Sequence, residues 1–267
     1  KHQTAVGSLK ELSELSGKDV TNTDPHRPFV DDITISCPEC KKTATRVPEV
    51  IDCWYDSGAM PFAQLSYPQQ NQDLFKTSYP ADFICEAIDQ TRGWFYTLMA
   101  IGTLVFDQSS YKNVVTLGHI LDEKGRKMSK HLGNVLEPIA LMDEHGADSV
   151  RWFMLASGSP WQARRVGHAA IQEVTRKVLL TYWNTASFLS LYTRLSTYKP
   201  GDKVIARKER PEIDQWLLSL VDDAVLQVTS ALENFDTQKA GRVLADVVDD
   251  MSNWYVRRNR RRFAGLC

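Results

Sequence analysis

The sequence lacks any apolar run long enough to cross a bilayer. Its longest apolar stretch, residues 94–106, is interrupted by Tyr96, Thr97, Gly102 and Thr103, whereas a transmembrane helix needs about 20 apolar residues. No cationic and apolar leader opens the chain, so secretion is not indicated. We therefore expect no membrane partner and a cytoplasmic location.

Cysteine is also scarce, with five among 267 residues, too few for a disulfide framework in a chain of this size. Only Cys37-Pro38-Glu39-Cys40 has the spacing of metal ligands. A structural zinc needs four ligands, and no second Cys/His pair is well placed. We expect Cys37 and Cys40 to be half of a zinc site that binds no zinc in this chain alone. Cys53 and Cys85 are predicted to be small buried hydrophobes.

A start methionine is missing as well: the chain opens at Lys1 and stops just after a basic segment. We interpret it as a fragment. The composition is that of a folded protein, with 43% hydrophobic and 24% charged residues. The net charge of −1 hides an uneven placement, because five arginines gather near the end: Arg257, Arg258, Arg260, Arg261 and Arg262. Such a cluster suits phosphate binding, and a solvated helix face is the alternative.

Three regions differ in pattern. Residues 1–80 are rich in proline and loops. In residues 81–163, strand-like runs at 81–85 and 113–117 enclose a helical segment at 91–107, which predicts a βαβ unit and a parallel sheet. A helix from Pro138 to Gly146 and a helix-like run at 148–156 follow. From about residue 168 the spacing is helical, with a polar break at 199–211.

Polar residues follow both predicted strands. Ligands of a parallel sheet sit beyond the carboxyl ends of its strands. The first strand leads into Glu86, Asp89 and Gln90, and the second into Gly118 and His119. We expect these two groups to face a common crevice, although Glu86 and Asp89 could instead cap the next helix.

The segment 118–134 carries the most specific pattern. It presents Lys127 and Lys130 with the Ser129 hydroxyl between them, which suits the neutralisation of a polyphosphate during phosphoryl or nucleotidyl transfer. The string Lys127-Met128-Ser129-Lys130, preceded by Gly118-His119 and followed by Gly133-Asn134, resembles the second signature of the class I aminoacyl-tRNA synthetases. His131 stands at a variable position where the family usually has a second serine.

Residues 52–58 and 86–95 resemble the isoleucine/valine/leucine branch of this family. The resemblance implies that Glu86, Asp89 and Gln90 hold the aminoacyl-adenylate. It also implies that Trp54 and Trp94 wall an aliphatic pocket, with ordinary aromatic core as their alternative.

The arginine-rich end, residues 253–262, is similar to the isoleucine-specific members, in which it falls in the helical domain that recognises the tRNA anticodon stem. The resemblance begins near Arg27. It implies a connective segment (1–80), the second half of a Rossmann-like catalytic domain (81–163) and an incomplete all-α anticodon-binding domain (164–267). In the family, the cysteines that partner Cys37 and Cys40 lie just upstream, so zinc is possible in the full-length enzyme.

The implied enzyme is a monomer that activates isoleucine with ATP and Mg²⁺ and transfers it to tRNA(Ile). Lys130 would contact the phosphates most directly, Lys127 would assist and Ser129 would hydrogen-bond. The backbone near His119 and Met128 would border the adenine. The first step depends mainly on positioning and charge neutralisation.

Two alternatives remain open: a valyl- or leucyl-tRNA synthetase, and a nucleotide- or tRNA-binding module without catalysis. The first class I signature, of the type His-x-Gly-His, does not occur in these residues, and nothing resembles the editing domain that such enzymes carry. We therefore expect the isolated chain to be inactive in adenylate formation.

Overall fold

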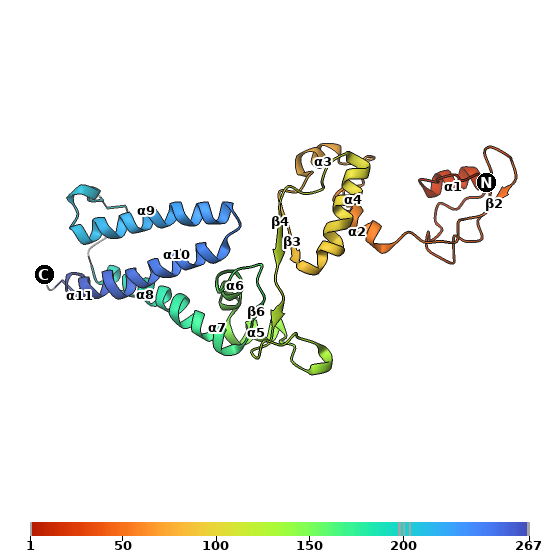
Figure 1. The fold of residues 1–267 in the computed structure, drawn as a ribbon. Helices are drawn as coiled ribbons and strands as arrows, with labels where there is room; N and C mark the ends of the chain where they lie inside the picture. The colour runs from red at the N-terminus through yellow and green to blue at the C-terminus, as the bar shows by residue number, and fades with distance from the viewer. Residues whose placement is uncertain (1, 197–198, 200, 203, 266–267) are drawn as a thin grey trace. The chain divides into compact units, whose positions relative to one another are not determined.

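The structure is a computed structural model that describes residues 2–196, 199, 201–202 and 204–265. The chain divides into two compact units, Lys1–Ser57 and Gly58–Cys267, and each is described by itself (Figure 1). Among the described residues, no helix combines the length and the apolar character that crossing a membrane requires.

The first unit is mostly irregular and is held by polar contacts. It contains α1 (Leu9–Ser16) and a hairpin of two short antiparallel strands, β1 (Ile35–Ser36) and β2 (Thr43–Ala44). The carboxylate of Asp31 accepts hydrogen bonds from Arg46 at 2.6 Å and from Arg27 at 2.9 Å. The two guanidinium groups lower the pKa of Asp31, and they tie together segments around residues 27, 31 and 46.

The second unit contains the predicted strand–helix–strand. Strands β3 (Ile84–Ala87) and β4 (Val114–Leu117) are parallel, with Ile84 opposite Val114 and Ala87 opposite Leu117. They are joined by the 3-10 turn η1 (Ile88–Arg92) and by α4 (Trp94–Phe106). The parallel pair with its helical crossover confirms the α/β prediction, although β3 starts at Ile84 rather than at residue 81.

Aromatic side chains pack α3 (Gln72–Ser78) and the end of α2 (Cys53–Ala63) onto α4. The ring centre of Phe106 lies 5.2 Å from that of Phe62 and 5.1 Å from that of Phe75. A β-carbon on Gly58 would come within 2.8 Å of the Thr97 carbonyl oxygen. Helix α2 can therefore approach α4 this closely only because residue 58 has no side chain.

A second parallel pair, β5 (Ile120–Leu121) and β6 (Arg164–Arg165), lies next to three helices, α5 (Pro138–His145), α6 (Ala147–Ala156) and α7 (His168–Val174). Helix α5 begins at Pro138 and stops before Gly146, as predicted. One apolar cluster joins these elements: Leu141, Val150, Phe153, Val166 and Ile171.

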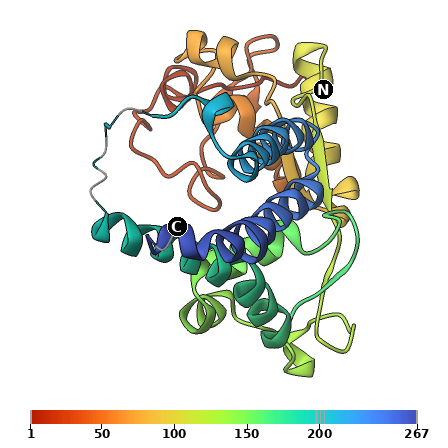
Figure 2. The same ribbon diagram turned by 90° about the vertical axis from the view of Figure 1, so that its left-hand side faces the viewer.

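The predicted all-helical end is confirmed among the described residues. Helix α7 continues through a π-helical stretch (Thr175–Leu179) into α8 (Leu180–Leu195). The helices α9 (Glu212–Glu233) and α10 (Thr237–Asp249) lie side by side (Figures 1 and 2). A second π-helical stretch (Asp250–Val256) leads into α11 (Arg257–Phe263). The predicted break at 199–211 separates α8 from α9, apart from residues 200 and 203, which lie outside the described part.

The prediction that Cys53 and Cys85 are buried was wrong, because both are exposed. It assumed neighbours that would cover them. Cys53 is the first residue of a helix, and Cys85 lies in β3, whose one partner among the described strands is β4.

Helix α10 crosses α6 at Gly241, where a β-carbon would lie 2.2 Å from the β-carbon of Ala156. Alanine is normally favoured over glycine in a helix by about 1 kcal/mol. We predict that Gly241→Ala nevertheless lowers the free energy of unfolding, by about 1–3 kcal/mol, because the added methyl overpacks the crossing. Urea unfolding measures this, and the double variant Gly241→Ala/Ala156→Gly should recover most of the loss. A more stable single variant would show that the crossing is not tight.

Candidate functional site

The lysine-containing loop begins as a tight turn after β5. The N–H of Gly125 donates to the Asp122 carbonyl at 2.8 Å, and the N–H of Asp122 donates to the Arg126 carbonyl at 2.9 Å. Leu121 then pairs with Lys127 in an antiparallel bridge. Gly125 has φ +78°, a left-handed conformation that glycine adopts without strain.

The buried carboxylate of Asp122 and the amide of Asn134 hold the two ends of this loop together. Asp122 accepts from the backbone N–H of Arg126 at 2.7 Å and from the Asn134 side-chain amide at 2.9 Å. The same amide donates to the Lys127 carbonyl at 3.2 Å, and its oxygen accepts from the Ser129 N–H at 2.9 Å. This Asp122–Asn134 network fixes the backbone on both sides of Met128. The Asn134 hydrogen bond, followed by the Arg126 N–H, lowers the pKa of Asp122 to about 2.

The residues predicted to handle ATP project from this fixed backbone. Met128 packs against the apolar cluster of α5, α6 and α7, whereas Lys127 and Lys130 are exposed and form no ion pair with any described residue. The hydroxyl of Ser129 accepts from the Leu132 N–H at 3.3 Å and so caps the short turn η2 (Lys130–Leu132). The loop thus exposes two ammonium groups without ion-pair partners, one just before the turn η2 and one at its first residue.

The predicted Gly118-His119 pair lies where another segment crosses the chain. The N–H of Gly118 donates to the Pro160 carbonyl at 2.8 Å. A β-carbon on Gly118 would come within 2.2 Å of the Gln162 carbonyl oxygen. The carbonyl of His119 accepts from the Arg164 N–H at 2.9 Å, while its side chain is left exposed. A close backbone approach therefore explains the glycine.

The register of β3 and β4 supports the expected meeting of the two strand ends. Ala87 pairs with Leu117, so Asp89 and Gln90 leave the sheet at the same edge as the Gly118-His119 pair. Gln90 is partly used locally, because its side-chain oxygen accepts from the Trp94 N–H at 2.8 Å at the start of α4. Among the described residues, the exposed carboxylates of Glu86 and Asp89 form no ion pair.

The two predicted pocket tryptophans fall in different units. Trp54 is exposed at the start of α2 in the first unit, and Trp94 is half-buried at the start of α4 in the second. Their shared pocket therefore stays a prediction.

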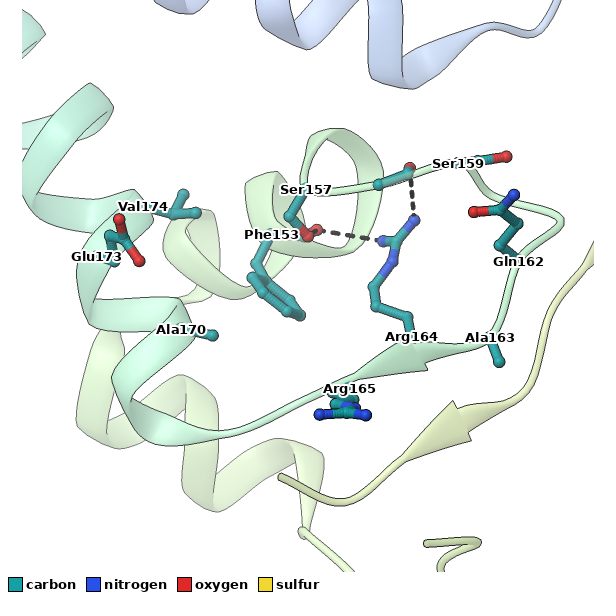
Figure 3. Close-up of a pocket in the computed structure, with 11 residues that line it drawn as sticks. Phe153, Ser157, Ser159, Gln162, Ala163, Arg164, Arg165, Ala170, Glu173 and Val174 are labelled. Atoms are coloured by element: carbon teal, nitrogen blue, oxygen red, sulfur yellow. Dashed lines mark hydrogen bonds between the residues drawn. The ribbon is translucent and has the colours of Figure 1, made fainter. Parts of the chain in front are cut away.

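A depression of about 400 Å³ opens between α6, β6 and α7 (Figure 3). Its central side chain, Arg164, points at the end of α6 and donates to the carbonyl oxygens of Gly158 at 2.8 Å and Phe153 at 3.2 Å. Burial lowers the pKa of Arg164. Arg164 therefore caps a helix end and ties it to β6, and sequence patterns gave no sign of this role.

The arginine-rich segment separates into two groups. Arg262 donates to the Asp214 carboxylate at 2.6 Å and to the Tyr255 hydroxyl at 3.1 Å, and so joins α11 to α9. Arg258 lies over the ring of Trp254, 4.3 Å from its centre. Four side chains are exposed to solvent: Arg257, Arg258, Arg260 and Arg261.

The predicted half zinc site has a third candidate ligand that the sequence analysis missed. The Sγ of Cys37 lies 3.6 Å from the Nδ1 of His2, and the ligand atoms of His2, Cys37 and Cys40 all lie within 4.8 Å of one another. The backbone N–H of Cys40, followed by His2, lowers the pKa of Cys37 to about 7, which favours the thiolate that binds metals. Three groups of the kinds that can bind a structural zinc therefore lie within reach of one another.

Comparison with known families identifies the fold. The profile of the tRNA synthetases class I (I, L, M and V) matches residues 2–166. The chain belongs to this family. A second profile, the anticodon-binding domain of tRNA ligase, matches residues 214–266.

Curated relatives agree. The chain is 67% identical over 264 residues to the isoleucine–tRNA ligase of Streptomyces avermitilis, which covers 98% of this chain and 25% of that protein. It is 50% identical over 268 residues to the isoleucine–tRNA ligase of Deinococcus radiodurans, covering 97% of this chain and 24% of that protein. The chain spans about a quarter of the length of these relatives.

Two solved structures share the fold. One is the Agrobacterium radiobacter K84 LeuRS in a complex with tRNA and LeuAMS (TM-score 0.62, 23% identity, 80% of this chain and 28% of that chain). The other is Mycobacterium tuberculosis methionyl-tRNA synthetase with methionyl-adenylate (TM-score 0.65, 20% identity, 86% of this chain and 43% of that chain). At this identity they support the fold alone.

The Asp122–Asn134 network predicts a specific pH response. The pKa of Asp122 is lowered, so its stabilising effect is complete above about pH 4, the range of an unfolded aspartate, and is lost as the pH falls toward the folded pKa of about 2. Asn134→Ala removes the largest cause and should raise the pKa of Asp122, as carboxyl NMR titration would measure. Asp82, whose pKa is lowered by Lys112, is the control and should not change. An unchanged Asp122 in the variant would contradict the network.

Proposed function

We propose that this chain is the part of an isoleucine–tRNA ligase that contains the ATP-handling loop and the beginning of the anticodon-binding domain. The single observation that carries the proposal is the loop itself, in which a part-buried network holds the backbone that carries two unpaired lysines. Identity of 67% to an isoleucine–tRNA ligase supports isoleucine over valine or leucine as the amino acid.

In the first step, the isoleucine carboxylate attacks the α-phosphorus of ATP and pyrophosphate leaves. Negative charge grows on the leaving phosphates, and Lys130 and Lys127 stabilise it because both ammonium groups are unpaired. The hydroxyl of Ser129 accepts from a backbone N–H, so its own hydrogen remains able to donate to a phosphate oxygen. The backbone at His119 and Met128 borders the adenine. Mg²⁺ would accompany ATP, although the described residues of the site form no dedicated carboxylate cage for it.

The aminoacyl-adenylate is held at the edge where β3 and β4 end. Glu86 and Asp89 offer carboxylates, and Gln90 offers an amide, to its ribose and amino groups. Trp94, at the start of α4, walls the aliphatic pocket, and the part of Trp54, which lies in the other unit, stays a prediction. The shared register of the two strands supports this placement.

The tRNA is bound by the helical region. Arg257, Arg258, Arg260 and Arg261 reach the phosphates, whereas Arg262 keeps α11 against α9. We further propose three sequence divisions: a connective segment (1–80), a catalytic half (81–163) and an anticodon-binding part (164–267). The enzyme would be a cytoplasmic monomer. Cys37, Cys40 and His2 would bind zinc with a fourth ligand, and the zinc would hold their irregular segment in shape.

Pyrophosphate exchange tests the assignment in the full-length enzyme. Lys130→Ala should lower kcat by about 10²–10³-fold, the effect of losing one donor that stabilises transition-state charge. Lys124→Ala, in the same loop and equally exposed, is the matched control and should leave the rate unchanged. Isoleucine should support faster exchange than valine or leucine, and a preference for valine would refute the proposal. The 267-residue chain alone should give no exchange, and a measurable rate from it would refute that expectation.

Salt dependence of tRNA binding separates the two groups of arginines. Each of the exposed arginines replaced by glutamine should make the plot of log K against log salt shallower by about one unit for every phosphate that is no longer neutralised. Arg262→Gln should lower the melting temperature, because it breaks the pair with Asp214, and should leave the salt slope nearly unchanged. Arg242→Gln, on α10, is the matched exposed control. A salt slope that no arginine variant changes would contradict the role of this segment.

A further inference from the structure

Two histidines and one glutamate meet where α5 ends and α7 begins. Glu144 and His145 are the last two residues of α5, and His168 is the first residue of α7. Three atoms converge there: the Oε1 of Glu144, the Nε2 of His145 and the Nδ1 of His168. We name these residues the His145–His168 cluster. The functions described above do not use it.

The distances among the three atoms match the ligand shell of a metal ion. They are 2.9 Å between the two nitrogens, 3.2 Å from His168 to Glu144 and 3.5 Å from His145 to Glu144. Zinc binds imidazole nitrogen and carboxylate oxygen at 2.0–2.1 Å in a tetrahedron, which separates neighbouring ligand atoms by about 3.3–3.4 Å. The mean of the observed edges is within a few tenths of an ångström of that value.

Convergence of these atoms also brings together three groups that can each offer a lone pair. A neutral imidazole carries one N–H and one bare nitrogen, and an ionised carboxylate carries no hydrogen. In the tautomers that leave both converging nitrogens bare, three lone pairs point at one another, which is the arrangement that binds a cation. In the other tautomers an N–H of one imidazole donates within the cluster.

One ligand of the cluster is buried in the protein, and the other two are partly exposed to solvent. The side chain of His145 is 4% exposed, and it follows Leu141 and Met142 of α5, which pack with Ile171 of α7 in one apolar cluster. Glu144 and His168 are about half exposed. A buried ligand therefore fixes the position, while the open side allows an ion to enter and a water molecule to complete the fourth position.

We infer that Glu144, His145 and His168 form a binding site for a divalent transition-metal ion of the zinc class. Two imidazoles with one carboxylate favour Zn²⁺, Co²⁺ or Ni²⁺, whereas Mg²⁺ and Ca²⁺ take oxygen ligands. The site belongs to the second unit and is separate in sequence from His2, Cys37 and Cys40.

The position of the site gives it a structural consequence. His168 also lines a depression of about 220 Å³ with Asp122 and Asn134, the two residues that fix the lysine loop. A metal bridging α5 and α7 would cross-link the elements against which Met128 packs. The bound ion would therefore stabilise the platform of the loop and take no part in the chemistry.

Cobalt titration of the metal-free protein tests the inference. In a Cys37→Ser/Cys40→Ser background, one equivalent of Co²⁺ should give visible d–d bands without the thiolate charge-transfer band of a cysteine site, and Zn²⁺ should displace it. His168→Gln and Glu144→Gln should each weaken binding by on the order of 100-fold, since loss of even an outer-shell partner costs 10–100-fold. His26→Gln is the matched control, because His26 pairs with Asp24 on the surface without a third ligand.

Equal affinity in the Cys37→Ser/Cys40→Ser protein and in its His168→Gln variant, or no d–d bands in the former, would overturn the inference and leave a hydrogen-bonded triad. A second readout does not depend on the cysteine background. In the unmodified protein, saturating Zn²⁺ should raise the melting temperature by mass action, and Glu144→Gln should lose a part of that rise that His26→Gln keeps. An identical rise in both variants would also overturn it.

Discussion

The hydrogen bonds of the Asp122–Asn134 network determine whether the lysine loop has a fixed shape. A glycine-containing loop of exposed, charged residues would otherwise sample many conformations, at a cost of about 1–2 kcal/mol for each residue that becomes ordered on binding. Asn134 satisfies this need with one side chain, because its amide contacts the backbone on both sides of Met128 and the carboxylate that closes the turn. The lysines can then remain unpaired, since the loop does not need them for its own stability.

The elements on which the lysine loop rests, α5, α6 and α7, are joined to the rest of the unit by close approaches that only small residues permit. Gly118 allows the segment at Pro160–Gln162 to cross the chain just after β4, and Gly241 allows α10 to lie against α6. The second contact joins the helical region to the elements that carry the loop. An ion pair makes a further connection within the helical region, because Arg262 binds Asp214 and so ties α11 to α9. The arginine-rich segment thus combines a structural residue, Arg262, with four arginines whose side chains are exposed.

Much of the second unit could be predicted from the sequence because its signals are local. The bounds of α5 follow from Pro138 and Gly146, and the loop follows from one contiguous string. Contacts between distant segments could not be predicted in this way. His2 approaches Cys37 across 35 positions, and His168 approaches His145 across 23. Neither pair has a spacing that marks a site. Arg262 likewise resembled its neighbours in sequence, and only the position of Asp214 on α9 distinguishes it.

The same apolar cluster explains why a metal at the His145–His168 cluster would affect the loop. Leu141 on α5 and Ile171 on α7 are buried in one apolar cluster. Met128 of the lysine loop packs against the same cluster. Close-packed interiors transmit small displacements, because no void absorbs them. A shift of α7 relative to α5 would therefore move the surface on which Met128 rests, and with it Lys127 and Lys130. A bond between the two helices limits that shift at its source, without any contact to the nucleotide.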